Sequence, residues 1–457
     1  MVKLFNVYHS KRTLFLVGCE LVLVSGTFLS SAKVLMGTQS TAALIDDNGW
    51  LKILGITAFT LLLNYYFDLY EPRRISEKWE TYFRVLLALS LLSFVLGGLL
   101  YLAPGLDIGR NVVLLGVSVL TFVLLAWRRT FEWISGLSLF SEHVYVLGCG
   151  SQARTVIDLI RSERVSGMQV VGCSGEAQAQ AELTQLVEDL DESHRHSTRV
   201  DRVIVAVEDR RERFPTRELL DLRLHGVVIE NCSTLMERLS GRLPLEGLYP
   251  STLIFADGFR LRPFQRLVRR ILSFAVALIA LSICLPFIPV IILAVRMSSP
   301  GPVLFRQTRV GRFGKTFTVF KFRTMRQDAE KNGAVWAKAN DPRVTRLGKM
   351  MRKTRLDEIP QLWNVLRGDM AFVGPRPERP EFVEWLRKDI SFYDLRNMVL
   401  PGLTGWAQVR FQYGASLEDT KRKLEYDLYY IKHQSIGLDL LVMFETIKTI
   451  VLRRGAQ

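Results

Sequence analysis

The stretch ILSFAVALIALSICLPFIPVIILAV, residues 271–295, decides the class of fold, because it runs for 25 residues without a charge. A straight helix of this length spans about 38 Å, which is enough to cross a bilayer. Pro286 and Pro289 interrupt it near the middle, and proline breaks helical hydrogen bonding. Basic residues are abundant on both sides, within 260–270 and 296–315. Two structures therefore stay open: a kinked transmembrane span, or a helix that bends and returns to the face it entered.

Four apolar stretches precede this segment and predict a bundle of four transmembrane helices within residues 1–130. Lys and Arg cluster at the N-terminus, after the second stretch and after the fourth. The positive-inside rule therefore places the N-terminus and everything after residue 128 in the cytoplasm. The first stretch is too long for a cleavable signal peptide and lacks its small-residue cleavage site. The four stretches are residues 14–36, 51–70, 83–103 and 112–127.

Residues 141–240 predict a Rossmann-like α/β domain. The stretch HVYVLGCGSQARTVIDLI begins at His143 and has the pattern of a strand, a glycine turn and a helix. Gly148, Gly150 and Ala153 fit the G-x-G-x-x-A pattern of dinucleotide-binding turns.

A bound dinucleotide does not follow from this motif alone. The predicted second strand ends at Cys173, and Ser174 and Gly175 separate it from Glu176, so no acidic residue is well placed to hold a ribose. The domain could therefore bind a nucleotide, or keep the fold in a structural or regulatory role. Residues 241–265 follow as a predicted linker.

Charge and cysteine content limit the classes of partner. The net charge is +15, and residues 297–355 hold fifteen Lys and Arg against three Asp and Glu. Such a region beside a membrane segment attracts the anionic headgroups of membrane phospholipids and a phosphate-bearing substrate. No nucleic-acid motif accompanies it, so no nucleic-acid partner is expected. None of the five cysteines forms a C-x-x-C pair, which indicates free thiols in a reducing compartment and no zinc site.

The stretch KTRLDEIPQLWNVLRGDMAFVGPRPE, residues 353–378, contains the adjacent acids Asp357 and Glu358. Pro360 suits the first turn of the amphipathic helix that follows, so the pair is expected at a helix N-terminus. Acids in that position commonly cap the helix and complement its dipole. The alternative is phosphate chemistry, in which one carboxylate attacks phosphorus and the other holds Mg²⁺.

Cations on glycine- and proline-rich loops favour the second interpretation. Positive side chains around a carboxylate pair would neutralise the charge that develops on phosphoryl oxygens. The predicted substrate- and phosphate-binding residues are Lys321, Arg323, Arg352, Arg355, Arg376 and Arg396.

These residues carry a resemblance to a known family. From about residue 262 to 454 the chain resembles the catalytic domain of the bacterial sugar transferases, which are monotopic phosphoglycosyl transferases. Five ordered blocks match: SSPGPVLFRQTRVG, FKFRTM, LDEIPQLWNVLRGDMAFVGPRPE, PGLTGWAQV and EYDLYYIKH. The upstream half resembles that of the large members, which prime exopolysaccharide, capsule or O-antigen synthesis.

The resemblance implies a hexose-1-phosphate transfer from a UDP-sugar to undecaprenyl phosphate, with release of UMP. Glucose is the first expected sugar and galactose the second. The reaction would be ping-pong: Asp357 would attack the β-phosphorus and carry the phosphosugar before the lipid accepts it. Glu358 matches the Mg²⁺-binding acid, and Arg376 matches a phosphate-contacting arginine.

The resemblance also implies an architecture. It comprises four transmembrane helices, the Rossmann-like domain and a mostly α-helical catalytic domain over residues 266–457. Pro286 matches the proline that bends a re-entrant membrane helix at 271–295, although the family often has serine before it and this chain has Leu285. A bacterial inner-membrane location with a cytoplasmic catalytic domain follows, and a homodimer is compatible with it.

Two other classes of function remain to be weighed. In one, the chain is a non-catalytic protein of polysaccharide assembly or export, or a membrane scaffold, whose last domain only docks partners. In the other, the Rossmann-like domain runs an NAD-dependent reaction on a sugar nucleotide. That domain lacks a clear Tyr-x-x-x-Lys set, which counts against the second class.

Overall fold

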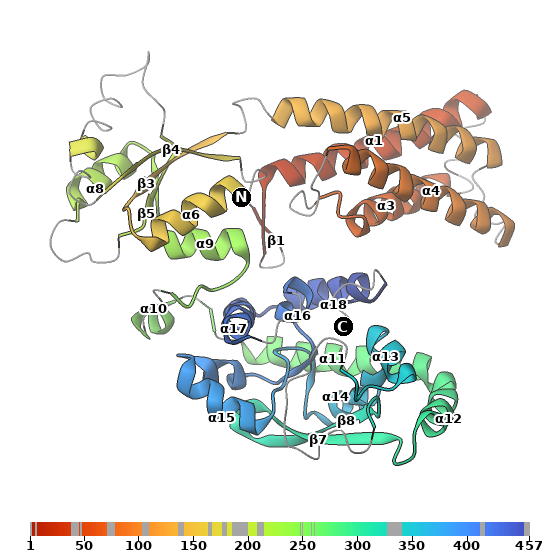
Figure 1. Ribbon diagram of the computed structural model, residues 1–457. Helices are drawn as coiled ribbons and strands as arrows, with labels where there is room; N and C mark the ends of the chain where they lie inside the picture. Colours follow the sequence, from red (N-terminus) through yellow and green to blue (C-terminus); the bar gives the residue numbers. More distant parts are fainter. Residues whose placement is uncertain are drawn as a thin grey trace. The chain divides into compact units, whose positions relative to one another are not determined.

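The computed structural model divides into two compact units (Figure 1). The first comprises Met1–Val2 and Tyr8–Leu235, and the second comprises Lys3–Val7 and Met236–Gln457. The residues that the structure describes are 2–4, 7–37, 45, 48–70, 78–102, 109–135, 141–162, 167–175, 181–184, 200–207, 214–246, 248, 250–256, 258–259, 261–326, 341–411 and 416–451.

Four long helices form the N-terminal bundle of the first unit. They are α1 (Lys11–Met36), α3 (Gly49–Tyr66), α4 (Lys78–Leu102) and α5 (Arg110–Ser135). Helix α1 lies beside α3 and α5, and α4 also lies beside both. Their shared core includes Phe28, Leu92 and Leu120, each fully buried. The four predicted helices are therefore present.

Hydropathy separates one of these helices from the others. Among the described residues, four helices are long and apolar enough to cross a membrane: Lys11–Met36, Trp79–Leu102, Arg110–Ile134 and Pro263–Ser298. The predicted span at 51–70 is not one of them. Its helix α3 has 18 residues, which include Lys52 and Asn64, so its mean hydropathy is lower. These helices indicate a membrane protein. The proline-containing segment at 271–295 lies within one of the four helices that could cross a membrane.

A buried charged cluster ties three parts of the bundle together. Glu20 of α1 is fully buried and lies 2.7 Å from the guanidinium of Arg128 in α5. Asn64 of α3 donates to the same carboxylate at 3.1 Å, and the Tyr70 hydroxyl donates to it at 2.5 Å. A charge inside an apolar bundle needs such partners, which explains how an apolar helix accommodates Glu20.

The rest of the first unit is an α/β domain with a wholly parallel sheet. Its strand order is β4-β3-β5-β6, and Figure 1 labels the first three of these strands. This order places the first two strands and their crossover helix beside each other, as the sequence pattern predicts. The strands are β3 (Glu142–Leu147), β4 (Met168–Ser174), β5 (Arg202–Val205) and β6 (Val228–Asn231), and the helices include α6 (Ser151–Ser162) and α8 (Thr216–Leu224). The boundary between the two units falls within the next helix, α9 (Cys232–Ser240), after Leu235.

Packing explains the first glycine of the G-x-G-x-x-A turn. Gly148 has φ +121°, and a Cβ there would lie 2.6 Å from the carbonyl oxygen of Ala206. Any larger residue would collide with the backbone that follows β5. Ala153 is likewise buried in α6. Internal packing thus accounts for these small residues without a ligand, while Glu176 lies outside the described residues.

The second unit is mostly helical, with two small sheets. Strands β7 and β8 form an antiparallel hairpin, and β9 pairs in parallel with β10. The elements are α10 (Pro250–Phe255), α11 (Pro263–Cys284), α12 (Ile288–Ser298), β7 (Leu304–Val310), β8 (Thr316–Phe322), α13 (Arg346–Lys353), α14 (Gln361–Arg367), β9 (Ala371–Val373), α15 (Pro380–Asp389), β10 (Gly402–Thr404), α16 (Trp406–Arg410), α17 (Leu417–Lys432) and α18 (Ile436–Val451).

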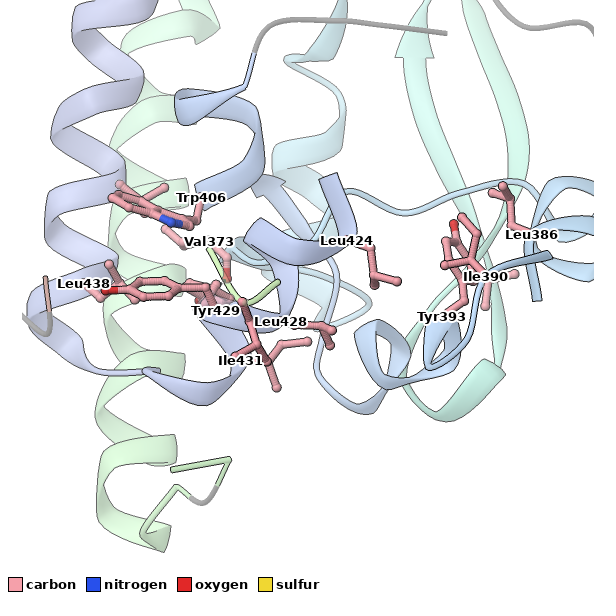
Figure 2. Close-up of a cluster of buried hydrophobic side chains, with 14 of the residues drawn as sticks. Val373, Leu386, Ile390, Tyr393, Trp406, Leu424, Leu428, Tyr429, Ile431 and Leu438 are labelled. Atoms are coloured by element: carbon pink, nitrogen blue, oxygen red, sulfur yellow. Dashed lines mark hydrogen bonds between the residues drawn. The ribbon is translucent and has the colours of Figure 1, made fainter. Parts of the chain in front are cut away.

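One hydrophobic core joins the C-terminal helices of this unit (Figure 2). Trp406 of α16 stacks on Tyr429 of α17 with ring centroids 6.0 Å apart. Leu438 of α18 is fully buried in the same cluster. Burial of these large apolar side chains stabilises the packing of α16, α17 and α18. Helix α17 is thereby held rigidly in the second unit.

The stretch 241–265, expected to be a linker, is partly built into this core. The Trp406 indole donates to the carbonyl of Gly241 at 2.8 Å. Leu243 is buried in the core, and its backbone N–H donates to the carbonyl of Glu425 at 3.0 Å. The apolar side chains of this stretch explain the difference, because they bury surface that a solvated linker would leave exposed.

The apolar segment is interrupted at the predicted proline. Helix α11 ends at Cys284, a single 3₁₀ turn covers Leu285–Phe287, and α12 begins at Ile288. Ala277 of α11 and Val295 of α12 are both fully buried in one cluster of the second unit. Both halves of the segment therefore pack against the same core.

Candidate active site

The acidic pair lies in its own 3₁₀ turn, Leu356–Glu358, between α13 and α14. This corrects the predicted placement, because Pro360 is the N-cap residue of α14 and not a residue of its first turn. Arg355 has φ +58°, a left-handed conformation that separates the turn from α13. Neither carboxylate accepts a hydrogen bond from α14 among the described residues, so side-chain capping of that helix does not explain the pair.

Glu358 is surrounded by three cations from separate segments. Its Oε1 lies 2.8 Å from Arg376 and 3.3 Å from the Lys321 ammonium on β8. Its Oε2 lies 3.4 Å from Arg355. The residue is 8% exposed, so these contacts compensate for the cost of a buried carboxylate.

Asp357 has a different environment although it is the adjacent residue. It is 7% exposed, and no hydrogen bond or ion pair to it occurs within the part of the chain that the structure describes. Arg352 influences it through its charge, but the Arg352 Nε donates to the hydroxyl of Thr324 at 3.0 Å. Asp357 is thus a buried carboxylate whose oxygens are not engaged.

These environments move the two pKa values in opposite directions. Burial and the neighbouring charge of Glu358 raise the pKa of Asp357 above its ordinary value, and nearby cations only partly offset this rise. Burial opposes ionisation of Glu358 as well, but Arg376, Lys321 and Arg355 outweigh it and hold the pKa of Glu358 well below its usual range. Glu358 therefore stays ionised, whereas Asp357 is the more basic of the two.

A stiff loop presents Arg376 to Glu358. Gly374 opens the GPRP loop, and a Cβ there would lie 2.5 Å from the carbonyl oxygen of Leu400. The second guanidinium nitrogen of Arg376 donates to the side chain of Gln408 at 3.1 Å. Gln408 was not identified as a site residue from the sequence. The signal that could have identified it is its polar side chain within the glycine-rich block PGLTGWAQV.

Two predicted phosphate-binding residues do not reach the pair. Arg323 is buried and donates to the carbonyl of Ser299, at the end of α12. Arg396 is buried and donates to the Tyr393 hydroxyl at 2.6 Å and to the backbone carbonyl of Arg376 at 2.8 Å. The structure brings together Lys321, Arg352, Arg355 and Arg376 around the acids, and Arg396 supports one of them from behind.

The pair thus offers one engaged and one open carboxylate within a ring of cations. An open, basic carboxylate can attack an electrophilic centre, and fixed cations can stabilise anionic oxygens on that centre. Among the described residues, no group of three or more His, Cys, Asp or Glu side chains could hold a metal ion. A metal ion held here would need ligands from its substrate, as Mg²⁺ commonly takes from phosphates and water.

Comparison with known proteins gives consistent matches. The family described as "Bacterial sugar transferase" matches residues 264–453. UDP-N-acetylgalactosamine-undecaprenyl-phosphate N-acetylgalactosaminephosphotransferase of Aeromonas hydrophila is 40% identical over 246 residues, covering 54% of this chain and 56% of that protein. UDP-glucose:undecaprenyl-phosphate glucose-1-phosphate transferase of Escherichia coli (strain K12) is 32% identical over 330 residues, 69% of each chain. UDP-galactose-lipid carrier transferase of Erwinia amylovora is 30% identical over 345 residues, 70% of each chain.

Proposed function

The chain belongs to the bacterial sugar transferase family, and from that premise we propose that it transfers a hexose-1-phosphate from a UDP-sugar to undecaprenyl phosphate, with release of UMP. The observation that carries the proposal is the contrast between Asp357, whose oxygens are open, and Glu358, whose oxygens are held by three cations. The names of the relatives support the substrates, although the match covers only 56% of the Aeromonas protein.

Asp357 is the proposed nucleophile. One of its oxygens attacks the β-phosphorus of the UDP-sugar, and the bond from that phosphorus to the bridging oxygen breaks. UMP leaves with the bonding electrons, and an aspartyl phosphosugar remains. A phosphate oxygen of undecaprenyl phosphate then attacks the same phosphorus, and the bond to Asp357 breaks. The products are the undecaprenyl diphosphate sugar and the original carboxylate.

The cations around Glu358 would act on the phosphates. Lys321 and Arg355 lie 3.3 and 3.4 Å from the Glu358 carboxylate. These contacts are long, so both cations can also interact with the oxygens of an incoming diphosphate. Arg376 is held more closely at 2.8 Å and would define the position of the phosphoryl group. Fixed donors of this kind stabilise charge that develops in a transition state.

The residues present fit Mg²⁺ only together with a nucleotide. Two adjacent carboxylates are too few for an ion held by protein alone, and a diphosphate would supply the further oxygen ligands. Glu358 would hold the ion, and Lys321 and Arg355 would supply positive charge to the phosphates. When bound, the ion would reduce the repulsion between the diphosphate and the attacking carboxylate and stabilise departing UMP.

The apolar segment is proposed to enter the membrane and return to the cytoplasmic face. Ala277 and Val295 flank the bend and are buried in one cluster with residues of α13 and α14. Arg270 of α11, directly before the apolar segment, donates to the carbonyl of Val365 at 2.7 Å, and the carbonyl of Ser299 after α12 accepts from Arg323. A crossing helix would separate its two ends by the full membrane thickness, so shared packing on one core favours a re-entrant helix in a cytoplasmic catalytic domain.

Release of UMP from a panel of UDP-sugars tests the proposal. Purified protein with Mg²⁺ and undecaprenyl phosphate should release UMP fastest from UDP-glucose. UDP-galactose is the second expected substrate. UDP-N-acetylgalactosamine belongs in the panel because the Aeromonas relative is named for it. An active wild type and an inactive Asp357→Asn variant support the proposal. Folded protein that releases no UMP from any member would favour a non-catalytic role in polysaccharide assembly or export.

A further inference from the structure

The GPRP loop is held mainly through its carbonyl groups, because its two prolines have no N–H to donate. Its first residue, Gly374, donates to the carbonyl of Thr404 at 2.9 Å. Gly402 donates to the carbonyl of Pro375 at 2.9 Å, and Val310 donates to the carbonyl of Glu378 at 2.9 Å. Arg309 donates to the carbonyl of Pro377 at 3.0 Å. Each of these contacts ties the loop to a neighbouring element, and together they leave the Arg376 carbonyl as the remaining acceptor between the prolines.

Arg396 occupies that position. Its guanidinium donates to the Arg376 carbonyl at 2.8 Å and to the Tyr393 hydroxyl at 2.6 Å. The same guanidinium lies 2.9 Å from the carboxylate of Asp427 on α17. The side chains of Arg396 and Asp427 are 9% and 4% exposed, so water has little access to this ion pair and cannot easily substitute for either partner. Asp427 therefore fixes Arg396, and Arg396 fixes the backbone that carries the Arg376 side chain.

We propose that Asp427 is a positioning residue for the transfer reaction: through Arg396 it holds the backbone of Arg376, and thereby aims the guanidinium that contacts Glu358. The inference rests on the proposed function. Asp427 touches neither acid of the pair, so it acts only through the two arginines. Supporting groups of this kind commonly change activity by about 10–100-fold when they are removed.

The surroundings of Asp427 give this role a pH signature. Burial raises the pKa of Asp427 to about 6, although Arg396 opposes the rise. The charged or titratable groups that face it are Arg396 and Tyr393 from the turn before β10, Glu378 directly after the GPRP loop, and Lys423 on α17. The carboxylate is charged above pH 6 and fixes Arg396. Below pH 6 it gains a proton, and the clamp on Arg376 weakens.

Asp427→Asn tests the role because asparagine keeps the shape and imitates the protonated form. At pH 8 the variant should release UMP with a kcat about 10–100-fold below wild type, while KM for the UDP-sugar changes by less than about threefold. The ratio of the two kcat values should fall toward one as the pH drops to 5. Titration of Asp357 cancels in this ratio, since both proteins contain it.

Glu425→Gln is the matched control. Glu425 is two residues from Asp427 on α17 and pairs with Arg242 at 2.8 Å, but it has no contact with the GPRP loop in the described chain. It should lower the thermal midpoint without the loss of kcat or the pH-dependent ratio. Equal losses of kcat in the two variants would overturn the inference, as would a ratio for Asp427→Asn that does not vary with pH.

Two further measurements keep the test decisive. If Asp427→Asn does not fold, Arg396→Lys keeps the buried charge pair but loses the planar guanidinium that contacts oxygens of Arg376, Tyr393 and Asp427, and it should show the same loss of kcat. Amide exchange at Gly402 and Val310, whose N–H groups donate to the carbonyls of Pro375 and Glu378, needs no activity: it should rise in Asp427→Asn and not in Glu425→Gln. If wild type releases no UMP, the proposed function fails, and unchanged exchange would separately overturn the clamp.

Discussion

Asp357 and Glu358 are adjacent in one 3₁₀ turn, yet Glu358 contacts three cations, whereas Asp357 has no ion-pair partner among the described residues. Lys321, Arg355 and Arg376 converge on the second acid and leave the first open. The turn therefore divides two similar side chains into one that is held in place and one whose oxygens can react.

The first prediction concerns turnover by Asp357→Asn. Asparagine preserves the shape of the side chain and removes the attacking charge, so the variant should fold but lose activity by a factor on the order of a thousand or more, or ~4 kcal/mol of barrier. Intact-mass measurement of wild type with UDP-sugar and no lipid should show a phosphosugar adduct that the variant lacks. A fully active variant, or an adduct that maps elsewhere, would refute the role of Asp357.

The second prediction is that the same substitution stabilises the fold at neutral pH. The pKa of Asp357 is raised by burial and by Glu358, so its ionisation costs folding free energy as the pH rises through the folded-state pKa. Asp357→Asn should raise the thermal midpoint at pH 7.5, with a gain on the order of 1 kcal/mol, roughly 2–4 °C for a domain of this size. The gain should shrink as the pH falls through the folded-state pKa, because the wild-type carboxyl then gains a proton. A lower thermal midpoint of Asp357→Asn at pH 7.5 would contradict the conclusion that the Asp357 carboxylate is a buried charge without an ion-pair partner.

The third prediction is that Glu358→Gln has the opposite effect on stability and lowers the thermal midpoint. Glutamine would leave Lys321, Arg355 and Arg376 without their shared anion, and removal of one partner from a buried ion pair commonly costs about 3–5 kcal/mol. The thermal midpoint should therefore fall, and the Mg²⁺ concentration needed for half-maximal UMP release should rise. Because the pKa of Glu358 is depressed, its contribution to stability is present above the unfolded pKa and is lost only as the pH falls through the folded-state pKa. A variant with unchanged stability and Mg²⁺ dependence would argue against both roles.

The sequence predicted elements whose signals are local. The glycine turn after His143 indicated a strand and helix of a parallel sheet, and Pro286 indicated the break between α11 and α12. Both depend on backbone preferences of residues that are close in the chain. The acidic pair was also identified locally, although its 3₁₀ turn was not, because the left-handed conformation of Arg355 has no sequence signal in an arginine.

The assignment of each cation depended on contacts between distant segments. Lys321 comes from β8, and Arg376 comes from a loop after β9, so only the folded chain shows that both reach Glu358. Arg396 resembled the other basic residues in sequence, but its role depends on Asp427 of α17. The core contacts of Leu243 were missed for the same reason, since a stretch rich in glycine and proline has the composition of a linker.

The fourth prediction concerns membrane topology. In a chain without native cysteines, single cysteines at Gln265 and Ser299 should both react with an impermeant thiol reagent only from the cytoplasmic side, because both ends of the apolar segment pack on one core. A cysteine at Asn48, in a loop predicted to face outward, is the control for the opposite side. Reaction of Gln265 and Ser299 from opposite sides would establish a crossing helix. Pro286→Ala should straighten the bend and lower activity.

The last prediction concerns the α/β domain, which we expect to be dispensable for the chemistry. The carboxylate pair and its cations all belong to the Met236–Gln457 part of the second unit. A shortened chain that starts at Met236 should keep UMP release in detergent, because it retains the ion pair of Glu237 with Lys432 and the core contacts of Leu243, although it lacks Val7 of the same core. A chain that starts at residue 260 loses both and should have a lower thermal midpoint.

Gly148→Val in the full chain is the companion test. Valine would collide with the backbone at Ala206, so it should disturb the α/β domain while leaving UMP release in detergent close to wild type. If the chain from Met236 is well folded but inactive, and Gly148→Val also abolishes turnover in a folded full chain, the α/β domain takes part in catalysis and the assignment of chemistry to the second unit alone is wrong. Retained activity in both would leave that domain a structural or regulatory role.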